Sequence, residues 1–148
     1  MTRGPINLKV VAERLEIVAR CLDDLRAVPS SSFEEFQADR RNPAAAESLL
    51  RRAIEALFDT ARHLLARAFG IGGLEYREVA RLAAERGLVV DPALCDKYVE
   101  IAGFRTRLTH FYGEVTTEEL FGVVANDLAD LERLAEELRA AAARLASR

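Results

Sequence analysis

Tryptophan is absent from this chain of 148 residues, and cysteine, methionine and proline are rare, with two, one and four copies. The two cysteines, Cys21 and Cys95, lie within helical patterns and do not have the spacing of metal ligands. A disulfide framework and a zinc site are therefore both disfavoured. We expect the cysteines to be small core residues in a reducing compartment.

The sequence also lacks long apolar runs and an excess of positive charge. No uncharged apolar stretch approaches the roughly 20 residues that span a bilayer. The first residues, MTRGPINLKVV, contain too short an apolar stretch for a secretory signal, and no small-residue cleavage site follows. The net charge is −3 and Lys9 and Lys97 are the only lysines, so the chain is not a polycation that coats nucleic acid. We expect a cytoplasmic protein that binds no membrane.

Apolar residues at helical spacing are abundant. Their recurrence at intervals of three and four predicts helices over residues 8–28, 33–40, 44–69, 76–87, 92–112 and 117–146. Pro5 could begin the first helix, with Asn7 as a competing cap, and Ser32 and Asp91 are expected to cap two later helices at their N-termini. Asn42-Pro43 is expected to break the chain before the longest helix, and Gly70 is expected to end that helix.

No segment shows the sustained polar and apolar alternation of a half-buried strand. The sequence therefore predicts an all-α fold, in which four main helices plus one or two short ones form an antiparallel bundle. We expect a single domain over residues 1–148, with a frayed alanine-rich tail from about residue 139.

Side chains that could bind a ligand or catalyse a reaction are concentrated in GFRTRLTHFYGEV, residues 103–115, although the chain has only two histidines and three tyrosines. At about 100° per residue, Arg105 and Tyr112 share one flank of the helix, and His110 lies about 240° from Phe104, away from the apolar stripe. His110 is thus either an ordinary surface residue or faces something outside the monomer's core. Arg105 and His110 converge only if the helix loosens or if a second subunit supplies one of them.

Several other polar residues have simpler explanations. His63 is expected to be a packing or surface residue rather than a catalyst, and Tyr98 a core or interface residue. Arg40-Arg41 and Arg51-Arg52 are expected to form solvated faces, with phosphate contact as the alternative. The glycines at 70–73 follow no strand and precede no Lys-Ser/Thr, so they are a helix stop and not a phosphate loop.

The segment resembles the R-x4-H-x-Y motif of HepT-type toxins in the HEPN (higher eukaryotes and prokaryotes nucleotide-binding) superfamily, with Arg105, His110 and Tyr112 as the motif residues. Neighbouring stretches are similar too, namely AGF, GEVTTEELFGVVANDLADLERL, FEEFQADRRN, AIEALFDTARHLLA and EYREVARLAAERG. The resemblance covers residues 8–138. One departure is Thr106, where the family usually has Asn, Asp or His; threonine can hydrogen-bond but cannot act as acid, base or amide clamp.

The resemblance implies the toxin of a type VII-like HepT/MNT toxin–antitoxin module. Such a protein is an endoribonuclease that works as a homodimer, with two motifs facing across the interface. It also implies a partner, a minimal nucleotidyltransferase (MNT) antitoxin that adds AMP to the motif tyrosine, here Tyr112. A tyrosine that merely caps the helix end is the alternative for Tyr112.

The chemistry of RNA cleavage fits these residues without a metal or cofactor. The 2′-hydroxyl of RNA is a built-in nucleophile, so the enzyme needs a base, an acid and a cation at the phosphate. His110 and its mate in a dimer would supply the acid and base, and Arg105 the phosphate clamp. Arg107 and Thr106 are candidate RNA contacts, with solvent exposure as the alternative for Arg107. Other hypotheses are a non-catalytic module that docks a nucleotidyltransferase or nucleotide, and a purely structural helical oligomer.

Overall fold

A computed structural model describes residues 3–110 and 115–148, apart from the side chain of His110. The described residues form helices and no strand, which confirms the all-α prediction. The helices are α1 (Leu8–Ala27), α2 (Phe33–Ala38), α3 (Arg41–Phe69), α4 (Tyr76–Glu85), α5 (Pro92–His110), α6 (Thr117–Asn126) and α7 (Leu128–Ala146).

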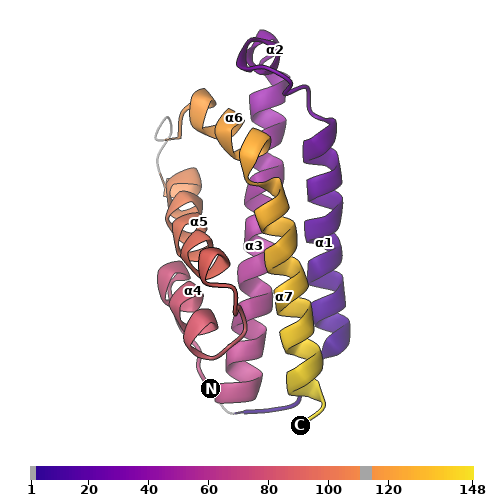
Figure 1. The fold of residues 1–148 in the computed structure, drawn as a ribbon, viewed down its shortest axis with the longest axis vertical. Helices are drawn as coiled ribbons and strands as arrows, with labels where there is room; N and C mark the ends of the chain where they lie inside the picture. Colours follow the sequence, from indigo (N-terminus) through magenta and orange to yellow (C-terminus); the bar gives the residue numbers. More distant parts are fainter. Residues whose placement is uncertain (1–2, 111–114) are drawn as a thin grey trace.

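The longest helix, α3, runs through the middle of the bundle (Figure 1). It packs against α1 on one side and against α4 and α5 on the other, and α7 contacts α1, α3 and α5. Successive main helices run in opposite directions, and the short helices α2 and α6 lie at the end of the bundle where α5 stops. The end of α5, which holds Arg105, therefore lies at one end of the bundle.

Side-chain hydrogen bonds cap the N-termini of several helices at the residues that the sequence predicts. The side chain of Asn7 accepts hydrogen bonds from the backbone N–H groups of Lys9 and Val10, and that of Ser32 accepts one from Glu35. Asp91 accepts one from the N–H of Ala93 at 2.9 Å. These bonds satisfy N–H groups that have no partner in the first turn of a helix, so the predicted caps are confirmed.

Two predicted boundaries are wrong. The α3 helix begins at Arg41, so Pro43 lies in its first turn, where a proline removes no helical hydrogen bond. The predicted helix over 117–146 is two helices, α6 and α7, that meet at Asp127 (φ −110°, ψ −5°). The break lets α6 reach α2 while α7 packs along α1, and Asp127 accepts a hydrogen bond from Lys97 at 3.3 Å. Over the described residues the bundle thus has three short helices, α2, α4 and α6.

The alanine-rich tail is part of the bundle. The α7 helix continues to Ala146, and Leu138, Ala141 and Ala142 are buried in the core. The small side chains at 141 and 142 allow α7 to approach its neighbours closely. The expected fraying from about residue 139 is therefore not seen in the described helix.

Among the described residues, Tyr98 of α5 is the tyrosine of the core, and it is fully buried. Its hydroxyl donates a hydrogen bond to the carbonyl oxygen of Leu57 at 2.9 Å, and its ring packs on Phe58 with the centroids 4.5 Å apart. Tyr98 is therefore a core residue that ties α5 to α3, upstream of the motif. Across the described residues, no helix is long and apolar enough to cross a membrane.

His63 has a structural role. Its Nε2 accepts a hydrogen bond from the backbone N–H of Asn7 at 3.0 Å, which fastens the start of α1 to α3. Burial, and then the charge of Arg67, lower the pKa of His63. Protonation of Nε2 would remove the acceptor, so the contact requires the neutral ring.

The stability of the fold should therefore fall at acid pH through His63. The pKa of His63 is lower in the folded protein than its unfolded value of about 6.5, so the unfolded chain binds more protons at acid pH. The stabilisation of the fold by His63 is therefore complete above about pH 6.5 and is lost as the pH falls through the folded pKa. His63→Ala should lose about 1 kcal/mol of unfolding free energy at pH 7.5. Urea unfolding at pH 7.5 and 5.5 should show a smaller pH dependence in the variant; an equal dependence would contradict this role.

Candidate functional site

The R-x4-H-x-Y motif lies at the end of α5. Arg105 is in the second-last turn and His110 is the last residue of the helix. The side chain of His110 and all of Tyr112 lie outside the described residues, so the predicted outward position of His110 and the flank shared by Arg105 and Tyr112 stay predictions. Of the three motif residues only Arg105 is described in full, together with the intervening residues 106–109.

Arg105 is turned inward, and its side chain is 13% exposed. Its Nε donates to Oε2 of Glu55 on α3 at 2.8 Å, and its Nη2 donates to the same oxygen. Nη1 donates to the hydroxyl of Thr109, one turn further along α5, also at 2.8 Å. Three of the five N–H groups of the guanidinium are thus engaged within the described chain, and two remain for another acceptor. The side chain is fixed in one orientation before any ligand arrives.

Tyr76, the first residue of α4, completes this arrangement. Its hydroxyl donates to the Glu55 carboxylate at 2.8 Å from Oε2, and its ring lies beneath two guanidinium groups, with Arg62 at 4.4 Å and Arg105 at 5.1 Å from the centroid. Burial, and then the hydrogen bond with Glu55, raise the pKa of Tyr76. The hydroxyl therefore stays protonated and donates to the carboxylate at neutral pH.

A chain of charges continues along α3. Arg62 lies 3.8 Å from both Glu55 and Asp59, and Arg14 of α1 lies 3.9 Å from Asp59. Burial and the nearby Glu55 raise the pKa of Asp59, and the arginines oppose them. We call Glu55, Asp59, Arg62, Tyr76 and Arg105 the polar network. It links α3, α4 and α5 beneath the motif.

The sequence interpretation missed the other members of this network. Glu55, Asp59 and Arg62 recur at intervals of four and three, which places them on one side of α3. A charged stripe on the most buried helix of the bundle was an available signal. The contact between this stripe and Arg105 could not be predicted from the sequence, because Glu55 and Arg105 are 50 residues apart.

Thr106 uses its hydroxyl within its own helix. The Oγ1 donates to the carbonyl oxygen of Ala102 at 3.1 Å, one turn back along α5. The residue is exposed, and its oxygen can still accept a hydrogen bond from a ligand. Thr106 therefore retains an acceptor function at this surface and has already used its single donor.

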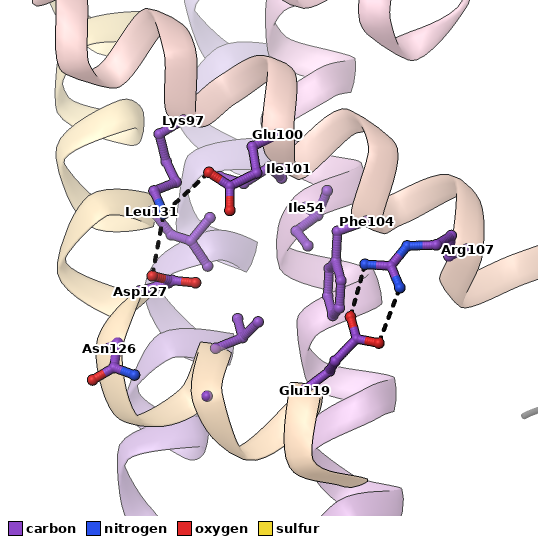
Figure 2. Close-up of a pocket in the computed structure, with 12 residues that line it drawn as sticks. Ile54, Lys97, Glu100, Ile101, Phe104, Arg107, Glu119, Asn126, Asp127 and Leu131 are labelled. Atoms are coloured by element: carbon purple, nitrogen blue, oxygen red, sulfur yellow. Dashed lines mark hydrogen bonds and ion pairs between the residues drawn. The ribbon is translucent and has the colours of Figure 1, made fainter. Parts of the chain in front are cut away.

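Arg107 connects the end of α5 to the start of α6. It donates to Oε1 of Glu119 at 3.1 Å, and its Nη2 lies 2.8 Å from Oε2, the two-pronged contact drawn in Figure 2. This hydrogen bond, and then the charge of Arg107, lower the pKa of Glu119. Because Thr116 also caps the N–H of Glu119, the ion pair anchors the first turn of α6. Arg107 is thus not simply solvated, and whether it contacts RNA stays a prediction.

A pocket with a volume of about 320 Å³ lies between α5 and α6, with the Arg107–Glu119 pair at one end. At the other end Lys97 is 3.3 Å from Asp127 and 3.5 Å from Glu100, and the apolar wall includes Phe104 (Figure 2). The described lining charges are therefore largely paired with one another.

Neither a metal site nor a reactive cysteine stands out in the described parts of the chain. No group of three or more His, Cys, Asp or Glu side chains there could hold a metal ion. Cys21 is buried and burial raises its pKa; Cys95 is half-buried, donates to the carbonyl of Val89, and also has a raised pKa. Both thiols therefore stay protonated at neutral pH, as core cysteines do.

The two arginine pairs face solvent or a local acid. Arg41 contacts Asp39 at 2.6 Å with 90% of its side chain exposed, and Arg51 contacts Glu47 at 3.1 Å. Arg40 and Arg52 are exposed. Arg40, Arg41 and Arg52 thus lie on solvated faces as predicted, whereas Arg51 is half-buried and its Nε is buried without a hydrogen-bond partner among the described residues.

The fold and the motif together define a HEPN-type helical bundle. The tri-AMPylated HEPN toxin of Shewanella oneidensis, solved in complex with MNT antitoxin, superposes with a TM-score of 0.78 at 23% identity and covers 88% of this chain and 97% of its own. A toxin–antitoxin structure with AMP-PNP gives 0.76 at 22% identity, over 87% and 97% of the two chains. At these identities the likeness establishes the fold.

The sequence comparison is more specific. A family model described as ribonuclease HepT-like matches residues 18–138, most of the chain, so the protein belongs to the HepT-like ribonuclease family. A tRNA nuclease HepT from Aphanizomenon flos-aquae (strain 2012/KM1/D3) is 23% identical over 117 residues, which is 78% of each chain. The resemblance inferred from the motif is confirmed.

Proposed function

We propose that this protein is a metal-independent endoribonuclease and the toxin of a toxin–antitoxin pair. The observation that carries the proposal is the fixed guanidinium of Arg105, held by Glu55 one turn and a half before His110 at the end of α5. Membership of the HepT-like ribonuclease family supports the same activity. The described residues contribute positioning and positive charge, and His110 contributes the proton transfers.

The reaction is a transfer of the phosphoryl group within the RNA strand. One imidazole takes the proton of a 2′-hydroxyl, whose oxygen bonds to the adjacent phosphorus. The bond from phosphorus to the 5′-oxygen breaks, and an imidazolium gives that oxygen a proton, so a 2′,3′-cyclic phosphate and a 5′-hydroxyl result. The two unengaged N–H groups of Arg105 would stabilise charge on the phosphate as it develops.

A homodimer would supply the second imidazole. Each chain has one motif histidine, and a two-fold axis would bring His110 of each protomer to a shared cleft. It would also let Arg105 of one protomer act with His110 of the other, which removes the need for the two to converge within one helix. Light scattering should give a dimer at micromolar concentration, and a monomer would contradict this part of the proposal.

The proposed partner is a nucleotidyltransferase antitoxin that adenylylates Tyr112. The toxin structures with MNT antitoxin and with AMP-PNP motivate this assignment. An adenylate on Tyr112 would bring negative charge and bulk next to a site that binds phosphate, and would exclude RNA. Tyr112→Phe should therefore keep cleavage but escape inhibition by modification.

Mass spectrometry of the co-expressed pair tests this regulation. We expect a mass increase of one AMP, or a small multiple, on the peptide that contains HFYGEV, and no increase on the same peptide of Tyr112→Phe. Full neutralisation of toxicity with an unmodified peptide would mean that the antitoxin acts by occlusion.

The alternative is a helical module that binds a nucleotidyltransferase or nucleotide without cutting RNA. The pairing of Arg105 with Glu55 and of Arg107 with Glu119 favours it, because both motif cations are already neutralised by carboxylates. Incubation of total RNA with the purified protein in EDTA separates the two functions. Cleavage that is absent from an Arg105→Ala/His110→Ala double variant supports the nuclease, and cleavage that requires Mg²⁺ would overturn the metal-independent mechanism.

A further inference from the structure

An open groove of about 580 Å³ runs between the first turn of α4 and the second half of α5. Its lining includes Tyr76 and Arg77 of α4 and Gly103, Thr106 and Arg107 of α5. Two candidate RNA contacts predicted from the sequence, Thr106 and Arg107, therefore face one groove. Arg105 is not among its lining residues, because it is turned toward α3 instead.

Arg77 differs from the other cations around the motif. Arg105 is paired with Glu55 and Arg107 with Glu119. Arg77 is exposed and makes no ion pair or hydrogen bond with any other described residue. It is thus a guanidinium at the groove with all five donors available, which suits a phosphate group.

Gly103 brings this guanidinium against the backbone of α5. A Cβ atom placed on Gly103 would lie 3.0 Å from Nη2 of Arg77 and 3.7 Å from its Nε. A side chain at 103 would therefore require Nη2 of Arg77 to shift by a few tenths of an ångström. The position of the Arg77 guanidinium on α4 therefore depends on the absence of a side chain at Gly103 of α5.

The groove also follows the face of α5 on which His110 falls. Gly103, Arg107 and His110 are separated by four and three residues, so these positions lie along one side of the helix. Arg105 lies on another flank. Arg77 is consequently a cation without an ion-pair partner among the described residues, on the side of α5 that carries position 110.

We propose that this groove binds the phosphate backbone of RNA, with Arg77 as its principal cation and Thr106 as an acceptor for a ribose hydroxyl. The proposal rests on the nuclease function, because it assigns a substrate-binding surface to that site. Two carboxylates, Glu75 and Glu100, also line the groove, but Lys97 lies 3.5 Å from Glu100. A phosphate is therefore expected beside Arg77 and Thr106. An acidic protein surface is the other ligand that an unpaired arginine could take.

Binding of labelled total tRNA, measured by fluorescence anisotropy, tests the proposal. The His110→Ala background prevents cleavage during the titration. Adding Arg77→Gln should weaken binding roughly 10-fold, the loss of one charged hydrogen-bonding group. A plot of log affinity against log salt concentration has a negative slope, and the substitution should make that slope less steep by about 0.7, the value for one phosphate contact on a single strand. Arg81→Gln, one turn further along α4, exposed and outside the groove, is the charge-matched control and should change neither.

Gly103→Ala gives a second, independent variant. Alanine favours a helix, so the fold should persist, while the added methyl group displaces the guanidinium of Arg77. Its effect on tRNA affinity should be absent when Arg77 is already glutamine. Additive effects of the two substitutions would contradict the shared arrangement.

The outcomes separate this inference from the nuclease proposal. If the wild-type protein cleaves RNA and Arg77→Gln changes neither affinity nor salt slope, the groove assignment is wrong and the nuclease stands. If Arg77→Gln weakens tRNA binding although the wild-type protein cleaves nothing, the groove assignment stands alone. Loss of antitoxin binding without loss of tRNA binding would assign the groove to the protein partner and overturn the proposal.

Discussion

His110→Ala should abolish RNA cleavage, with a loss of about 100-fold or more in the cleavage rate and no loss of fold. The chain has two histidines, and the other one, His63, is engaged as a hydrogen-bond acceptor for Asn7 at the start of α1. His110 is therefore the imidazole left for proton transfer. As the last residue of α5, it can be replaced by alanine at little cost to the helix.

The matched control is the other histidine. His63→Gln keeps a side-chain acceptor near Asn7 and should cleave RNA at the wild-type rate. Initial rates of cleavage of total tRNA, together with circular dichroism, give the comparison. A His110→Ala protein that is folded, dimeric and still active would exclude His110 as the acid–base group.

Arg105→Lys should lower cleavage by about 100-fold, as expected when a donor to the developing charge is removed. An ammonium can reach Glu55 or the phosphate, but it cannot hold the carboxylate with two N–H groups and present others to the substrate. Because the side chain is only 13% exposed and tied to Glu55, we also expect a loss of about 1–3 kcal/mol in unfolding free energy. Rates and urea unfolding should be measured on the same preparations.

Arg133→Lys is the control for the loss of a guanidinium. Arg133 of α7 lies 2.8 Å from Asp91, just before the first turn of α5, so the variant weakens a comparable contact at the far end of the helix. It should leave the cleavage rate unchanged. If Arg133→Lys and Arg105→Lys reduced cleavage equally, the effect of Arg105 would be one of helix packing.

Glu55 is a positioning residue in this scheme, and a double-mutant cycle tests it. Glu55→Gln should reduce kcat about 10-fold with little change in KM, because the glutamine amide cannot hold Arg105 as a carboxylate does. In the Arg105→Lys background the same substitution should add little. A full independent effect there would mean that Glu55 acts on something other than Arg105.

Much of the bundle could be predicted from local patterns. Asn7, Ser32 and Asp91 are caps because a side-chain oxygen beside a helix start satisfies N–H groups that have no other partner. The break at Asp127 was not predicted, because the apolar stripe continues through it. The bend lets α6 pack against α2 and α3, and it lets Asp127 accept a hydrogen bond from Lys97 of α5. Tertiary contacts thus overrode a helical pattern that was locally consistent.

The candidate site likewise has a part that could be predicted from the sequence and a part that could not. The motif residues Arg105, His110 and Tyr112 are predicted from one short segment and its resemblance to the family motif, and their roles stay a prediction. The carboxylate that holds Arg105, and the groove formed with Arg77, were not found. Each involves residues from helices far apart in the sequence, and helical periodicity relates positions only within one helix.

By itself, then, the sequence determined which segments become helices, which face of each is apolar, and which family the chain resembles. The first two properties depend on neighbours within about four residues, whose geometry the helix fixes. Only the tertiary structure decided that Arg105 turns inward to Glu55, while Arg77 lies beside Gly103 and has no ion-pair partner in the part of the chain that the structure describes. A charged side chain takes its partner from whichever helix packs against it, and that choice is made by the burial of the core as a whole.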